Sequence, residues 1–204
     1  MKEFEIVIAS HNMHKIREFK AMLKGFLNLD IRSLADFPEY VAPEENGKTF
    51  EENAIVKAVH AAKTLQRFVL ADDSGLTVPA LKGAPGIFSA RYAGNQATDF
   101  ENRKKLLSEM ASLVDEERNA YYECCIALAS PDGLIKTATG ICVGTIAIQD
   151  KGGSGFGYDP IFIKDSYHKS FSELGDEIKN RISHRRKSLD KLIPTIESLL
   201  VLPA

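Results

Sequence analysis

Two adjacent carboxylates, Asp72 and Asp73, follow the apolar run Phe68-Val69-Leu70 and precede Ser74. A buried strand that ends in two carboxylates places negative charge at a strand tip, where α/β proteins bind their ligands. Oxygen ligands of this kind suit Mg²⁺. The alternative is that Asp-Asp-Ser-Gly forms only a turn, because Asp, Ser and Gly are common turn residues. Local composition alone does not favour the ligand site over the turn.

A second candidate site lies at the N-terminal turn. An apolar strand over residues 5–10 gives way at His11 and Asn12 to a helix that carries Lys15 in its first turn. Such a turn directs unpaired backbone N–H groups and the positive end of the helix dipole at one point, which favours a phosphate. The alternative is an ordinary capped helix with a solvated lysine, for which Ser10 and Asn12 are both suitable N-caps.

These two stretches resemble a known family. The residues from Asp72 to Gly94 are similar to the signature of the inosine triphosphate pyrophosphatase family, hydrolases of non-standard purine nucleoside triphosphates. Residues 10–15, Ser-His-Asn-Met-His-Lys, resemble the family's Thr-Gly-Asn-x-x-Lys phosphate-binding turn. His11 stands where most relatives have glycine, and histidine could instead donate a hydrogen bond to a phosphate oxygen.

Three further segments extend the resemblance. Residues 49–54 match the family's Thr-Phe-x-x-Asn-Ala segment, and the acidic pair Glu44 and Glu45 lies ahead of them. Residues 155–160 match its Gly-Phe-Gly-Tyr-Asp-Pro, where glycines let the backbone approach the nucleotide and aromatic rings offer a stacking face. The basic segment that begins at Lys179 matches the last segment of the family.

The resemblance implies a role for each matching residue. By the resemblance, Glu44 or Glu45 is a metal ligand. We assign Mg²⁺ to Glu44 and Asp73, with Glu45 and Asp72 as helpers, and Asp73 is the family's proposed proton acceptor. The implied substrate-binding residues are Ser10, His11, Asn12, Met13, His14, Lys15, Ser74, Phe156, Gly157, Tyr158, Asp159, Lys179, His184 and Arg185.

Charge and hydrogen bonding give these roles a chemical reason. Water must attack the α-phosphorus while Mg²⁺ neutralises the triphosphate. Lys15 and Lys179 would add positive charge along the phosphates. An arginine offers only donors, so Arg185 would suit the 6-oxygen of hypoxanthine or xanthine and reject the amino group of adenine. Asn53 and Lys57, one helical turn apart, would face the same side and could reach phosphate.

Composition narrows the class of protein. At 204 residues and 44% hydrophobic, the chain can bury a core as a single domain over residues 1–204. A net charge of −2 gives no basic field for a nucleic-acid polymer. The three cysteines lack Cys-x-x-Cys spacing, so we expect reduced packing residues. No apolar run approaches the about 20 residues of a membrane span, so we expect a cytoplasmic protein without membrane contact.

The pattern of elements predicts the fold. Capping boxes at Thr49 and Thr98 predict two helices, and Pro194 should kink or split an amphipathic C-terminal helix. In the first helix, Glu18 falls among the residues expected to face away from the core. Strands are expected over residues 5–10, 29–33, 68–70, 122–130 and 135–149, the last two forming a hairpin about the turn 131–133.

We therefore expect an α/β fold: a twisted mixed sheet flanked by helices, in two lobes with a central nucleotide-binding cleft. The family resemblance further implies a homodimer. The expected function is hydrolysis of ITP, dITP and XTP to the monophosphate and pyrophosphate with Mg²⁺. Two alternatives stay open: a nucleotide-binding module without catalysis, suggested by His11 and His14, or a pyrophosphatase that prefers another modified nucleotide.

Overall fold

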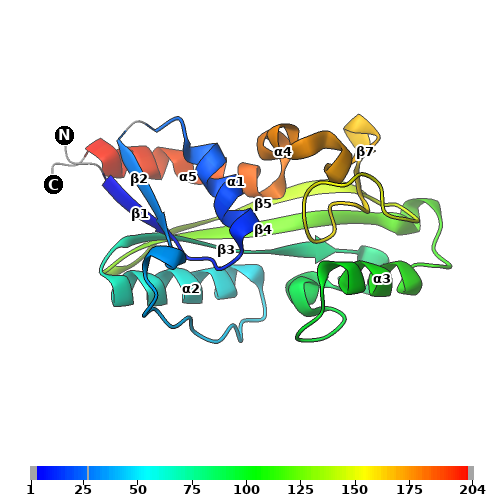
Figure 1. Ribbon diagram of the computed structural model, residues 1–204, viewed down its shortest axis with the longest axis horizontal. Coiled ribbons are helices and arrows are strands. Elements are labelled where there is room, and N and C mark those ends of the chain that lie inside the picture. Colours follow the sequence, from blue (N-terminus) through cyan, green and yellow to red (C-terminus); the bar gives the residue numbers. More distant parts are fainter. Residues whose placement is uncertain (1–3, 27, 202–204) are drawn as a thin grey trace. The chain divides into compact units, whose positions relative to one another are not determined.

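The computed structural model describes residues 4–26 and 28–201. Within these residues, the strands form a seven-stranded sheet in the order β2-β1-β3-β4-β5-β6-β7 (Figure 1). The strands are β1 (Phe4–Ile8), β2 (Leu29–Ser33), β3 (Phe68–Thr77), β4 (Asn119–Ser130), β5 (Gly133–Ile146), β6 (Phe162–Lys164) and β7 (Lys169–Ser170). The main helices are α1 (Met13–Leu23), α2 (Phe50–Leu65), α3 (Asp99–Glu109), α4 (Phe171–Ile182) and α5 (His184–Val201).

The sheet is mixed, as predicted. β1 runs parallel to both β2 and β3. β6 runs antiparallel to both β5 and β7. The predicted α/β class with a mixed sheet and flanking helices is therefore confirmed.

The chain divides into two compact units, each with its own core. Unit 1 comprises Met1–Asp73, Cys124–Gly140 and Arg185–Ala204, and unit 2 comprises Ser74–Glu123 and Ile141–His184.

In unit 1, β1 is buried on both faces. Ile6, Val7 and Ile8 are each at most 1% exposed, as expected of a strand with parallel neighbours and helices on either side. Helices α1 and α5 pack against one face, where Phe19 and Leu192 join Ile6 and Ile8 in one cluster. Figure 1 shows α2 on the other side of this part of the sheet, and its buried side is built largely of alanines.

In unit 2, Tyr122 on β4 lies at the centre of an aromatic core. Its ring centroid is 4.7 Å from that of Phe162 and 5.9 Å from that of Phe171. Leu106 and Met110 bring α3 into the same apolar cluster. In Figure 1, α3 and α4 lie on opposite sides of this part of the sheet. The loops at the ends of these elements therefore start from a packed core.

The carboxylate pair lies inside β3, so the predicted strand tip is wrong, and so is the alternative of a simple turn. The pairing of β3 with β1 runs from Phe68 to Leu70, where β1 ends. β3 nevertheless continues to Thr77. Asp72 and Asp73 therefore follow the end of β1 rather than the end of their own strand.

The predicted capping boxes form to different degrees. Thr98 and Glu101 cap α3 reciprocally, as predicted. At α2, the Thr49 side chain accepts a hydrogen bond from the Glu52 N–H. The Glu52 carboxylate, however, accepts from the N–H of Lys48, at 2.6 Å, so only half of this predicted box forms.

The long hairpin is confirmed, whereas Pro194, predicted to kink or split the last helix, does not split it. Pro131 and Asp132 alone connect β4 to β5, and so short a connection makes the strands antiparallel. β5 ends at Ile146 rather than at Gln149. Helix α5 continues through Pro194. This residue is exposed, so water can solvate the carbonyl that loses its helical hydrogen bond.

Two other predictions concern the cysteines and membrane-spanning helices. Cys124, Cys125 and Cys142 are buried thiols rather than disulfide partners, which confirms their packing role. Of the helices that the structure describes, none has the length and apolar character of a membrane span.

Candidate active site

The Asp73 carboxylate in unit 1 is held by two side chains of α2. Lys57 Nζ lies 3.2 Å from Oδ1, and Asn53 Nδ2 donates to Oδ2 at 3.0 Å. The two α2 residues thus face the same side, as their spacing predicts. Burial by itself lowers the pKa of Lys57, but the neighbouring carboxylates, Asp73 first among them, raise it above its ordinary value. Lys57 therefore stays charged beside Asp73.

Asp72 points into a different set of cations in unit 1. Its Oδ2 is 3.1 Å from Lys15 Nζ and 2.9 Å from Arg185 Nη2. Burial by itself raises the pKa of this carboxyl, but the charges of Lys15, Arg185 and Lys57 outweigh it and hold the pKa well below its usual range. Asp72 is thus ionised at neutral pH and anchors the N-terminal turn and the start of α5.

Glu18 completes this cluster, so the prediction that it faces away from the core is wrong. It lies on α1, is 7% exposed, and accepts a hydrogen bond from Arg185 Nη1. A carboxylate can be buried there because a guanidinium neutralises it. The only local signal would have been its position one turn after Lys15, since its partner is 167 residues away.

The N-terminal turn is built as a capped helix start. The Asn12 side chain accepts from the N–H of His14 at 2.9 Å and of Lys15 at 3.3 Å. The Ser10 hydroxyl accepts from the Asn12 N–H at 3.1 Å. His11, Met13 and His14 are exposed. The turn therefore combines a rigid cap with a surface open to solvent, and Asn12 is the N-cap among the two predicted candidates.

Glu44 and Glu45 lie in the exposed loop before α2. Lys57 Nζ is 3.2 Å from Glu45 Oε2, so one ammonium bridges Glu45 and Asp73. The Glu44 carboxylate accepts from Asn46 Nδ2 at 3.1 Å. Across residues 4–26 and 28–201, no group of three or more His, Cys, Asp and Glu side chains is arranged to hold a metal. Mg²⁺ commonly takes one or two carboxylates and completes its shell with water and substrate phosphates. Glu45 and Asp73, which share Lys57, supply carboxylate oxygens of that kind.

Unit 2 carries the second set of predicted residues. Lys179 Nζ lies 2.6 Å from Asp159 Oδ2, with both side chains at most 3% exposed. The same ammonium lies 4.3 Å from the centroid of the Phe156 ring. Asp159 Oδ2 also accepts from the Phe156 N–H at 3.0 Å. The carboxylate, ammonium and ring therefore form one interlocked group.

The glycine before this ring cannot be replaced without disturbance. Gly155 has φ +81°, and a Cβ there would lie 2.5 Å from Asp159 Oδ2. The close approach of carboxylate and backbone thus requires glycine.

His184 and Tyr158 are fixed within unit 2. The His184 ring stacks on Tyr122, with centroids 4.6 Å apart and planes 9° apart. The Tyr158 hydroxyl donates to the Ser89 carbonyl at 2.9 Å, and the residue is 4% exposed. Tyr158 therefore packs in the core, and Phe156 is the aromatic residue of this segment with the larger exposure. Ser74, at the start of unit 2, is half-buried.

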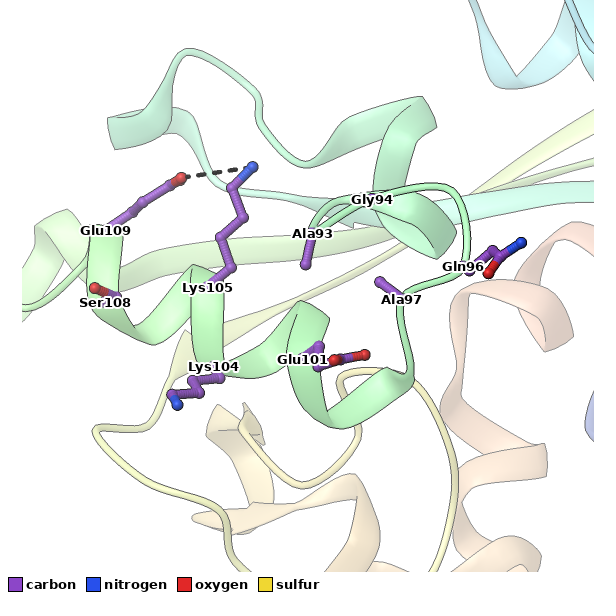
Figure 2. A pocket seen from close by; sticks show the side chains of 9 residues that line it. All are labelled: Ala93, Gly94, Gln96, Ala97, Glu101, Lys104, Lys105, Ser108 and Glu109. Atoms are coloured by element: carbon purple, nitrogen blue, oxygen red, sulfur yellow. Dashed lines mark ion pairs between the residues drawn. The ribbon is translucent and has the colours of Figure 1, made fainter.

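An open pocket beside α3, with a cavity volume of about 680 Å³, contains none of the predicted site residues (Figure 2). Lys105 and Glu109, one turn apart on α3, form an ion pair in its lining at 3.9 Å. Its lining consists of Ala93, Gly94, Gln96, Ala97, Glu101, Lys104, Lys105, Ser108 and Glu109. Because this pocket contains none of the predicted site residues, we do not assign the candidate active site to it.

Comparison with known proteins gives a consistent result. The model of the Ham1 family matches residues 6–195. The dITP/XTP pyrophosphatase of Protochlamydia amoebophila is 59% identical over 196 residues, covering 96% of this chain and 98% of that protein. The dITP/XTP pyrophosphatase of Chlamydia caviae is 54% identical over 197 residues, covering 96% of each.

Solved structures of similar chains have the same fold. The chain resembles the HAM1 protein from Coxiella burnetii with a TM-score of 0.85 and 41% identity, over 96% of this chain and 99% of that one. It resembles the Staphylococcus aureus Ham1 protein with a TM-score of 0.84 and 43% identity, again over 96% and 99%.

Proposed function

Because this chain belongs to the Ham1 family, we propose that it hydrolyses non-standard purine nucleoside triphosphates, namely ITP, dITP and XTP, to the nucleoside monophosphate and pyrophosphate. Membership of this family agrees with the resemblance found in the sequence. Two relatives that are more than half identical to the chain carry the name dITP/XTP pyrophosphatase, which supports the choice of substrate class.

One structural observation carries the proposal. Two adjacent carboxylates, Asp72 and Asp73, are each paired with a lysine from a different helix. The side chains of these lysines, Lys15 and Lys57, are 17% and 14% exposed, so neither is fully buried. Alternating carboxylates and ammonium groups match a magnesium triphosphate, whose metal takes carboxylate oxygens and whose phosphates take cations.

We assign the reaction steps to residues of unit 1. Glu44 and Asp73 would hold Mg²⁺, and Glu45 would stay with Lys57. When bound, the metal would neutralise charge on the triphosphate and activate the attacking water. Asp73 would accept a proton from that water as it attacks the α-phosphorus, and Lys15 would turn from Asp72 towards phosphate oxygens.

Base binding is proposed for the residues that match the family's later segments. Phe156 would offer a face to the purine, with Lys179 and Asp159 holding the ring in place. His184, stacked on Tyr122, would lie at the base. The family resemblance also implies that Arg185 donates to the purine 6-oxygen and so rejects adenine, although in the structure this guanidinium is buried between Asp72 and Glu18.

The setting of this activity is also a proposal. Mg²⁺ as cofactor and a homodimer are proposed from the family resemblance, and a cytoplasmic location is proposed from the sequence. Light scattering of the purified protein measures the assembly directly, and a mass of one chain would contradict the homodimer.

The bond that is cleaved tests the proposed function. Hydrolysis of ITP in ¹⁸O-labelled water should place the label in inosine monophosphate and none in pyrophosphate, because water attacks the α-phosphorus. Label in the pyrophosphate, or release of orthophosphate, would contradict the proposal. ITP binding without any labelled product would favour the alternative of a nucleotide-binding module, for which the exposed His11 in the phosphate turn is the motivation.

The two loop glutamates should differ in their effect on metal dependence. Glu44→Gln should raise the Mg²⁺ concentration for half-maximal activity at least about tenfold, because a ligand is lost. Glu45→Gln should change it less, since that carboxylate already pairs with Lys57. A magnesium titration of both variants measures this, and a larger effect of Glu45→Gln would move the metal ligand to that residue.

A further inference from the structure

Both backbone polar groups of Gly157, in the proposed base-binding turn, are held by side chains of α3. The Gly157 N–H donates to Asp99 Oδ2 at 2.7 Å. Its carbonyl accepts from Arg103 Nη1 at 2.9 Å. Asp99 and Arg103 are four residues apart and therefore project from the same side of the helix. Neither residue belongs to the segments that the sequence analysis assigned to the site.

These two hydrogen bonds act on the most flexible point of the turn. Gly157 has φ +60°, a conformation that glycine adopts readily and other residues avoid. Its N–H belongs to the peptide plane before it and its carbonyl to the plane after it. Holding both planes fixes the φ and ψ of Gly157, and with them the direction in which Phe156 leaves the turn.

Asp150 orients the Arg103 side chain for its contact with the Gly157 carbonyl. Arg103 Nε lies 3.1 Å from Asp150 Oδ1, and Arg103 Nη2 lies 2.8 Å from Oδ2. The Arg103 side chain is 13% exposed, against 39% for Asp150. A planar guanidinium held by two bonds to one carboxylate points its remaining donor in a fixed direction.

The rest of the turn is already anchored by other contacts. Asp159 binds the Phe156 N–H, and the Tyr158 hydroxyl binds the Ser89 carbonyl. At Gly157 the turn faces open space, since no described atom lies within 4 Å of where a Cβ would be. The α3 contacts thus hold the backbone at a point that a ligand can approach.

We infer that Asp99 and Arg103 are positioning residues that hold the Phe156–Tyr158 turn ready for the purine base before substrate arrives. The inference rests on the proposed function in assigning this turn to the base. A turn that spends only a fraction of its time in the binding conformation weakens apparent affinity by that fraction. Loss of either side chain should therefore weaken substrate binding and leave the chemical step alone.

Steady-state kinetics with ITP should show this division. Asp99→Ala and Arg103→Met should each raise KM about tenfold with kcat nearly unchanged. Asp99→Asn, which keeps an oxygen acceptor for the Gly157 N–H, should recover most of the loss. Lys104→Met, on the exposed side of the same helix, is the control and should match the wild type. Tripolyphosphate has no base, so its inhibition constant should be the same in all variants.

Several results would contradict the positioning role of Asp99 and Arg103. Equal weakening of ITP and tripolyphosphate would show a general defect and overturn the inference, as would an unchanged KM in Asp99→Ala. The Gly157 amide is a second readout that needs no turnover: in NMR relaxation of ¹⁵N-labelled protein it should be rigid in the wild type and mobile in Asp99→Ala. If the wild type does not hydrolyse ITP, the proposed function fails, and a Gly157 amide that stays rigid in Asp99→Ala separately overturns the positioning role.

Discussion

Asp73→Asn should reduce pyrophosphate release from ITP by about 10³-fold or more, with the fold preserved. The substitution removes an anionic metal ligand and the proposed proton acceptor together, while changing the size of the side chain very little. The surrounding contacts can persist, because Asn53 can still donate to the new amide oxygen and Lys57 retains Glu45. Initial rates of pyrophosphate release measure the loss of activity. Circular dichroism and a urea unfolding curve show whether the fold is preserved.

A matched control separates the specific role of Asp73 from the general effect of losing one carboxylate charge. Asp132→Asn changes the same functional group in the exposed turn between β4 and β5, and should leave the rate unchanged. If Asp73→Asn hydrolysed ITP at the wild-type rate, the assignment of Asp73 to metal binding and proton transfer would be wrong.

Removing Arg185 should cost about 3–5 kcal/mol of unfolding free energy, because it leaves buried carboxylates without their main partner. Arg185 is 1% exposed and contacts both Asp72 and Glu18. The variant Arg185→Met keeps much of the volume and loses the charge. Its neighbour Arg186 pairs with Asp190 on the surface, so Arg186→Met should cost at most about 1 kcal/mol. Urea unfolding of the two variants gives the comparison, and equal costs would refute the buried ion cluster.

The same cluster makes the free energy of unfolding depend on pH. The pKa of Asp72 is lower in the folded protein than in the unfolded chain, where an Asp titrates near about pH 4. Its contribution to stability is therefore complete above that value and is lost as the pH falls through the folded pKa. Since Arg185 supports that low pKa, the stability difference between the wild type and Arg185→Met should narrow from neutral pH to about pH 3. A difference independent of pH would mean that Arg185 acts through packing alone.

Local signals in the sequence were sufficient for much of the site. Asn12 and Lys15 could be identified because a helix cap and a first-turn lysine depend on a few neighbouring residues. The side shared by Asn53 and Lys57 follows from helical spacing alone. Both α2 side chains do meet at Asp73.

Contacts between distant segments could not be predicted in the same way. The length of β3 beyond Leu70 depends on its pairing with β4, so Asp72 was expected at a strand end and lies within the strand. Glu18 was assigned to the solvent side because its partner Arg185 is remote in sequence. The contact of Asp99 with Gly157 spans 58 residues, and no sequence motif indicates it. In each case, tertiary contacts determine the outcome rather than local pattern.

The most direct test of the account is pyrophosphate release from ITP, XTP, ATP and GTP in the presence of Mg²⁺, with and without EDTA. We expect strong release from ITP and XTP, weak release from ATP and GTP, and loss of all activity with EDTA. Equal release from all four nucleotides would contradict the proposed selection of non-standard purines. No release from ITP or XTP at saturating Mg²⁺ would contradict the enzyme itself.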